Sequence, residues 1–336
     1  MAKRYSSKKG RNIEPSVMTM LFTAPPVTGG STGEHTIDLS QCASLLNRRF
    51  YRQGINWAVA GIKIISSGQG TVVVKKLPNT WVMSNSWTKG FKAWQKMNSE
   101  ALAEAESVRP KFLDFKIYAD AKHHTDGYAG NLLPLGSNYT PAVAGEWVSS
   151  KYVVPNTAGA AGAVNNFEVI ATGASYPGGG ASGLNAVSLI EGYASGRALP
   201  VIQEPGRPDD AADADGATPE NWMSALFNDG TSQDDQVLAD MISENNESPY
   251  PFEGDGTHTD TMYPGGANQL VGLQIHDWES LSGTTIGGMT RVKGGNFPCG
   301  LVRFDWTPIE TSNIAIQVDL IPGSHRGYLC EPMTEM

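Results

Sequence analysis

The chain has little of what marks a disulfide-stabilised, zinc-bound or membrane-spanning protein. Its 336 residues include only three cysteines, Cys42, Cys299 and Cys330, which lie far apart and have no Cys or His residues close by. This spacing indicates neither a disulfide framework nor a zinc site, and it is typical of a reducing compartment. No apolar run approaches the ~20 residues that cross a bilayer. The short apolar run at 17–24 follows a Glu-Pro pair, so a signal peptide is not indicated and no membrane insertion is expected.

The sequence also lacks the motifs that organise common active sites. It has no G-x-S-x-G nucleophile elbow, no P-loop and no H-E-x-x-H pair. The histidines at 123–124, 258 and 276 stand near acids, as chance would give in so acidic a chain. The loop 213–216 lacks the further acids that an EF-hand requires. We therefore expect no enzyme activity, no catalytic residue, no metal ligand and no cofactor, and leave open a calcium ion between carboxylates at a subunit contact.

What the sequence does have is a series of short apolar stretches separated by turns, with 38 glycines and 20 prolines. Residues 55–65 are apolar on both alternating faces, which predicts a central strand buried between layers. A short helix is expected at 41–47 with Ser40 as N-cap, and a longer one near Ser86. About eight strands without βαβ alternation predict an all-β fold, an antiparallel sandwich or barrel. The strand candidates are 35–39, 55–65, 71–77, 112–120, 146–154, 167–172, 269–278, 299–306 and 314–321.

Charge is strongly segregated along the chain, whose net charge is −9. Residues 1–12 hold five bases and no acid, and they predict a flexible basic arm. Between Glu204 and Asp260 there are 15 acids and one base, Arg207. We interpret residues 173–265 as an acidic, projecting insertion of mixed structure, with the β-rich body at 13–172 and 266–336.

Two basic clusters are candidates for binding nucleic-acid phosphates without reading sequence. The first is the arm; the second follows the predicted short helix and surrounds Phe50 and Tyr51, which could stack on bases. For the second cluster the alternative, which the sequence favours slightly, is a salt-bridge patch between subunits. The candidate nucleic-acid-binding residues are Lys3, Arg4, Lys8, Lys9, Arg11, Arg48, Arg49 and Arg52.

Several stretches resemble capsid proteins of small circular Rep-encoding single-stranded DNA viruses, with smacovirus-like or related environmental lineages the most similar. The resemblance is carried by residues 35–54, 76–81, 85–91, 111–118 and 318–323. It implies a single eight-stranded antiparallel jelly roll that self-assembles into an icosahedral shell in the virion. It also implies that the basic N-terminus faces the packaged single-stranded DNA and that the outer surface contacts a host receptor.

Two other functions fit the same composition. A secreted β-sandwich that binds or cleaves carbohydrate would use the eight tryptophans, the eleven tyrosines and the loop carboxylates. The coat protein of a positive-strand RNA virus would share the basic arm and the β-rich body.

Overall fold

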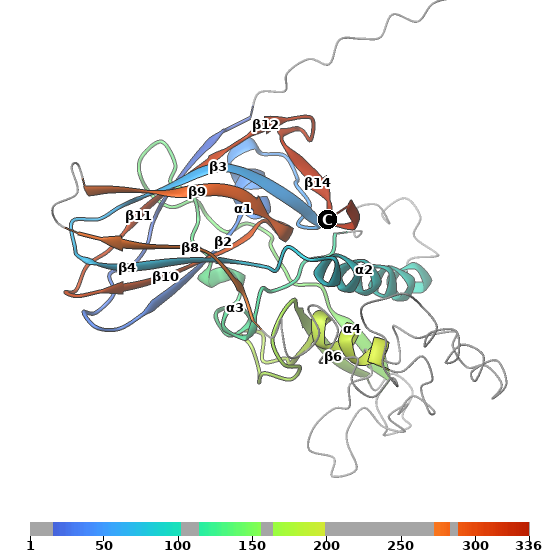
Figure 1. The fold of residues 1–336 in the computed structure, drawn as a ribbon. Coiled ribbons are helices and arrows are strands. Elements are labelled where there is room, and N and C mark those ends of the chain that lie inside the picture. The colour runs from blue at the N-terminus through green and yellow to red at the C-terminus, as the bar shows by residue number, and fades with distance from the viewer. Residues whose placement is uncertain (1–15, 102–113, 156–163, 199–271, 283–287, 336) are drawn as a thin grey trace, which may run out of the picture.

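The computed structural model describes residues 16–101, 114–155, 164–198, 272–282 and 288–335 (Figure 1). The basic arm, the acidic stretch from Glu204 to Asp260 and most of the predicted insertion at 173–265 lie outside these residues. No helix in the part that the structure describes is long and apolar enough to cross a membrane.

The body consists of two antiparallel sheets, one of five strands and one of four; Figure 1 shows how they are arranged. In the first, β1, β11, β3 and β9 are neighbours in that order, with β1 at Thr19–Thr23, β11 at Ala315–Leu320, β3 at Ile55–Ile65 and β9 at Met289–Phe297. The short β14, at Cys330–Pro332, also pairs with β3 in this sheet. The second has the order β2-β10-β4-β8, with β2 at Gly33–Asp38, β10 at Leu301–Pro308, β4 at Gly70–Lys76 and β8 at Gln274–Leu281. The chain passes from one sheet to the other at every step except between β4 and β8. The predominantly antiparallel β fold is therefore confirmed.

The main core lies between these two sheets, because each strand turns one face of its alternating side chains inward. The strand β11 shows the pattern clearly, with Ile316, Val318 and Leu320 buried between half-buried neighbours. The largest fully buried side chains of this core include Phe22, Trp57, Phe297, Phe304 and Trp306, which come from four strands.

The strand β3 departs from its prediction in an informative way. Its residues were expected to be buried on both faces, yet Ala60 is exposed and Lys63 is half-buried. The register between β3 and β11 shifts at Ala60, as at a β-bulge, and Ala60 has no paired residue in β9. The bulge changes the alternation phase, so that Trp57 and Val59 before it and Ile62 and Ile64 after it all point into one core.

Residues 77–273 connect the hydrogen-bonded neighbours β4 and β8, so the insertion is longer than predicted. Its described part holds α2 at Trp81–Ala101, α3 at Ala121–Asp126, α4 at Leu189–Ala198 and a small sheet. That sheet contains β5 at Tyr152–Pro155, β6 at Val164–Ile170 and β7 at Ala186–Ser188. A second core joins α2, α4 and this sheet, and includes Trp87, Trp94, Phe115, Tyr152, Phe167 and Leu189. The boundary predicted between 172 and 173 therefore runs through this core.

Other predicted elements also differ. The strands expected at 146–154 and 167–172 correspond to β5 and β6, which lie in the small sheet and not in the body. The described end of 112–120 forms only an isolated bridge between Tyr118 and Ile170. Two body strands, β1 and β9, were not predicted. The helix α2, with 21 residues, is long and begins five residues before Ser86.

Shorter elements complete the chain. The helix α1, Leu39–Asn47, follows β2 directly, and β14, Cys330–Pro332, pairs with the start of β3. The strands β12 and β13, Pro322–Gly323 and Gly327–Tyr328, form a small hairpin. Single 3-10 turns lie at Tyr128–Gly130, Pro298–Gly300 and Met333–Glu335.

The central position of Phe304 gives a test of this core. Phe304 on β10 is fully buried, whereas Phe50 is 47% exposed. We expect Phe304→Ala to lower the free energy of unfolding by about 3–5 kcal/mol, because it leaves a cavity between the sheets. The matched Phe50→Ala change should lower it by less than about 1 kcal/mol. Urea titration followed by tryptophan fluorescence measures both, and similar losses would contradict the assigned core.

Candidate nucleic-acid interface

The predicted arginine cluster lies on the loop between α1 and β3. The loop begins at Arg48, which ends α1 in the left-handed conformation with φ 53°. Arg48, Arg49 and Arg52 are exposed, and so is Phe50, whereas Tyr51 is fully buried. The loop therefore turns three cations and one aromatic ring to solvent. Of the two aromatic residues predicted to stack on bases, Phe50 is accessible and Tyr51 is not.

Tyr51 anchors the loop to the body. Its backbone N–H donates to Ser44 Oγ at 2.9 Å, and its hydroxyl donates to the Arg326 carbonyl at 3.0 Å. Its ring packs edge-on against Tyr328, with centroids 5.4 Å apart, and also contacts Trp57. A buried tyrosine with its hydroxyl satisfied fixes both the position and the direction of a short loop.

Gln53 is the second anchor and is also fully buried. Its Oε1 accepts from the Ile117 N–H at 2.6 Å, and its Nε2 donates to the Ile117 carbonyl at 3.1 Å. A third bond runs from Nε2 to Asp38 Oδ2 at 3.0 Å. The Gln53 side chain thus satisfies both backbone groups of Ile117, as a neighbouring strand would, and connects the loop to the long insertion.

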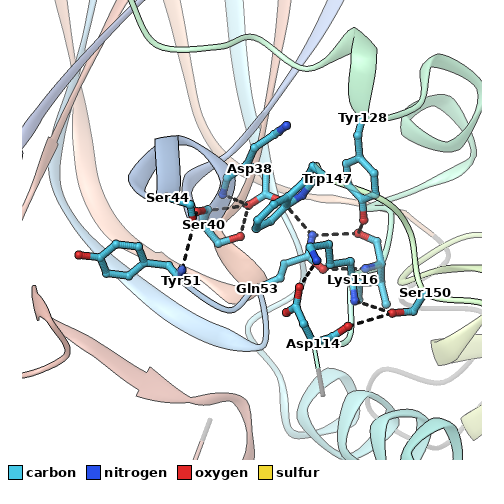
Figure 2. Close-up of polar contacts among 12 residues, drawn as sticks. Asp38, Ser40, Ser44, Tyr51, Gln53, Asp114, Lys116, Tyr128, Trp147 and Ser150 are labelled. Atoms are coloured by element: carbon cyan, nitrogen blue, oxygen red, sulfur yellow. Dashed lines mark hydrogen bonds and ion pairs between the residues drawn. The ribbon is translucent and has the colours of Figure 1, made fainter. Parts of the chain in front are cut away.

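Asp38, the last residue of β2, gathers these bonds (Figure 2). Its Oδ1 caps α1 by accepting from the Ser40 and Gln41 N–H groups at 2.9 and 3.2 Å, and it also accepts from the Ser40 hydroxyl. The N-cap is therefore Asp38 and not Ser40 as predicted. Its Oδ2 accepts from Gln53 and from Trp147 Nε1, the latter at 3.1 Å.

The carboxyl group of Asp38 is completely buried. Burial raises its pKa to about 6, while hydrogen bonds from Ser40, Gln41 and Gln53 oppose that rise. The group is therefore ionised at neutral pH, in the form that accepts from every donor around it.

Lys116 and Trp147 form a platform beside Phe50. The Lys116 ammonium lies 4.5 Å from the Trp147 ring centroid and 5.4 Å from that of Phe50, and the two rings are 6.2 Å apart. Lys116 also pairs with Asp114, and its backbone N–H donates to Ser150 Oγ at 2.9 Å (Figure 2). Burial raises the pKa of Asp114 and the lysine opposes that shift. The ammonium group is held under the aromatic rings rather than extended into solvent.

The root of the basic arm lies next to this loop. The Val17 N–H donates to Asn47 Oδ1 at 2.9 Å, and the Val17 carbonyl accepts from the Tyr328 hydroxyl at 2.7 Å. Asn47 Nδ2 also donates to the Tyr328 hydroxyl, at 2.7 Å. Asn47 immediately precedes Arg48, so the chain that leads to the arm meets the body at the arginine loop.

The arm residues Lys3, Arg4, Lys8, Lys9 and Arg11 lie outside the described residues. Covalent geometry nevertheless limits their distance from the loop, because an extended chain spans at most ~3.6 Å per residue. Arg11 can therefore lie no farther than roughly 20 Å from Val17. The described chain that follows the arm therefore starts beside the arginine loop.

Three further residues belong to this surface although sequence reasoning missed them. Arg326 Nη1 donates to the Phe50 carbonyl at 2.5 Å, and Phe50, Arg52, His325 and Arg326 line a hollow of about 340 Å³. Lys116, Trp147 and Arg326 are far from the loop in sequence, so only tertiary structure brings them together. Charge patterning along the chain offers no signal for them.

The histidines that stand near acids have different surroundings. His124 and Glu168 are buried and joined by a 2.8 Å hydrogen bond, and Ser149 also donates to Glu168. Burial acts to raise the pKa of Glu168, but hydrogen bonds from His124, Ser149 and Ser182 hold it below its usual value. Burial lowers the pKa of His123 to about 3. Both histidines fasten α3 to its neighbours.

Other candidate ligands do not converge in the described structure. His276 bonds to the Lys293 carbonyl at 3.0 Å, and the three cysteines are unpaired. Among the residues that the structure describes, no three His, Cys, Asp or Glu side chains are placed to hold a metal ion. His258 and the loop 213–216 lie outside the described ranges.

The chain matches no protein-family model, no curated protein and no solved structure. The candidate interface is therefore described by its geometry alone: exposed cations and one exposed aromatic ring on a loop whose inward residues form buried hydrogen bonds.

The role of Asp38 can be tested by Asp38→Asn. An amide in place of Oδ2 would direct N–H groups at the Gln53 and Trp147 donors, so we expect a loss of about 3 kcal/mol in the free energy of unfolding. The control is Asp126→Asn in the partly exposed Lys122–Asp126 pair of α3, which should change stability by about 0.5 kcal/mol or less. Urea unfolding at neutral pH compares them, and equal stability of the two variants would contradict the assigned network.

Proposed function

We propose that this chain is a viral coat subunit that assembles into a closed shell and packages single-stranded DNA. The sheet orders β1-β11-β3-β9 and β2-β10-β4-β8 support the finer assignment of the body as an eight-stranded jelly roll. In such a fold successive strands pass between the two sheets, as they do here in all but one step. Viral capsid proteins and lectins are among the users of this architecture, so the fold alone does not select between them.

The observation that carries the proposal is where the chain that follows the basic residues 1–12 meets the body. Val17 is hydrogen-bonded to Asn47, which immediately precedes the exposed Arg48, so the segment that carries five bases continues from a point beside the arginine loop. Clustered cations bind phosphates without sequence preference, which is what packaging a whole genome requires. The resemblance to coat proteins of single-stranded DNA viruses supports DNA as the cargo.

The acidic stretch between Glu204 and Asp260 fits the outer surface of such a shell. Packaged phosphates would repel 15 acids, whereas solvent hydrates them and would leave the exterior anionic. Contact with a host receptor would then involve residues 173–265, an assignment that rests on analogy with other coat proteins.

Electron microscopy of the purified full-length chain tests assembly. We expect closed shells of uniform size that protect nucleic acid from added nuclease. Digestion of the extracted nucleic acid with DNase or RNase separates the DNA proposal from an RNA-virus coat protein. A chain that remains monomeric across a range of salt, pH and calcium concentrations would overturn the proposal.

The arginine loop makes a quantitative prediction. Replacing Arg48, Arg49 and Arg52 with serine should weaken binding to single-stranded DNA and lower the slope of log affinity against log salt by about 2, because three phosphate contacts are lost. The fold should persist, since these side chains are exposed. Fluorescence anisotropy at several salt concentrations measures the slope.

The matched control removes the same charge elsewhere. Lys92, Lys122 and Lys151 are exposed residues of the long insertion. Their triple replacement with serine should change the salt slope by much less. Equal losses in the two triple variants would mean that net charge, and not the arginine loop, governs binding.

A further inference from the structure

We infer that Phe50, with Arg52 and Arg326, forms a site for one unpaired nucleobase and its phosphate. The inference deepens the proposed function and rests on it: it states which form of nucleic acid the surface prefers. The chemistry is base stacking on the Phe50 ring combined with guanidinium contacts to the adjoining phosphate.

The first support is the state of the Phe50 ring. Phe50 is 47% exposed, whereas the phenylalanines of the sandwich core, such as Phe22, Phe297 and Phe304, are fully buried. The Lys116 ammonium lies 5.4 Å from the Phe50 ring centroid, and the Trp147 ring lies 6.2 Å away at an interplanar angle of 50°. These two groups cover part of the ring, and its exposed part is accessible to a ligand.

The second support is that the backbone that carries the ring is held in place before any ligand binds. The Phe50 carbonyl accepts from Arg326, the next residue is buried, and Gln53 is fixed by three hydrogen bonds. A preformed platform loses little conformational entropy on binding, which favours affinity. An exposed phenylalanine on a mobile loop would lack this advantage.

The third support is the placement of cations around the ring. Arg52 is exposed and lines the same hollow as Phe50, His325 and Arg326. One guanidinium nitrogen of Arg326 is used by the Phe50 carbonyl, and the planar group has further N–H donors for a phosphate oxygen. A base on the ring would thus bring its phosphate to a cationic hollow.

This arrangement discriminates between nucleic-acid forms. A base in a duplex is already stacked and paired, so it can reach the ring only after disruption of the helix. Stacking on an aromatic side chain contributes about 1–3 kcal/mol per base and tolerates any base. Cations alone would give no such preference for single strands, because the duplex carries the denser charge.

The test uses Phe50→Leu and Phe50→Trp in the full-length chain. Binding is measured by fluorescence anisotropy with oligo(dT), oligo(dA) and their duplex at one salt concentration. We expect Phe50→Leu to weaken binding to both single strands by about 5- to 100-fold and to leave duplex affinity unchanged, and Phe50→Trp to retain single-strand affinity. The control Trp278→Leu removes a 59% exposed aromatic side chain from β8 and should alter neither.

The outcomes separate this inference from the proposed function. Unchanged single-strand affinity in Phe50→Leu, or an equal loss for single strands and duplex, would overturn the stacking site. If the arginine triple variant still loses affinity, the packaging proposal survives that result. If Phe50→Leu prevents assembly while its subunits bind single strands normally, then Phe50 lies at a contact between copies, and the inference is wrong. If neither variant loses affinity, both proposals fail.

Discussion

The arrangement of this protein depends on one buried carboxylate. Asp38 ends a strand of the sandwich, caps the helix α1, and accepts hydrogen bonds from Gln53 on the arginine loop and from Trp147 in the long insertion. An unpaired charge in such a position would be strongly destabilising, and here donors from three separate parts of the chain compensate its desolvation. The body, the loop and the insertion are thus joined by a group that is stable only when all three are in place.

The strands were predictable where the apolar pattern is uniform along the whole strand. Buried and half-buried side chains alternate regularly in β4 and β11, and the sequence placed β4, β10 and β11 within one or two residues. The strand β3 was located correctly, but the burial of its side chains was predicted wrongly. The bulge at Ala60 reverses which alternate side chains face the core, so both sets look apolar in the sequence. The strand β9 was missed because its sequence shows no apolar alternation. Val292 is its only buried residue before Phe297; exposed Arg291 and Lys293 flank it, and a Gly-Gly pair follows. Local periodicity cannot identify such a strand, since its pairing with β3 defines it.

The candidate site shows the same limit. Arg48, Arg49 and Arg52 were found by charge, which is a local signal. The sequence could not decide which of Phe50 and Tyr51 faces solvent, because an irregular loop has no fixed period. The supporting groups Lys116, Trp147 and Arg326 come from two other parts of the chain. The sequence shows which residue types could bind phosphate. It does not show the tertiary contacts around the Phe50 ring.

In the arginine loop, the residues that hold the fold and the residues that face solvent are different ones. Tyr51 and Gln53 point inward and use their polar atoms in hydrogen bonds to Arg326, Asp38 and Ile117. The residues between and before them, Phe50 and Arg52 among them, point outward. Because the inward groups carry the fold, the outward groups can bind a polyanion or change without destabilising the body. Because hydrogen bonds fix the inward groups, the backbone that carries Phe50 and the arginines has a defined position on the body.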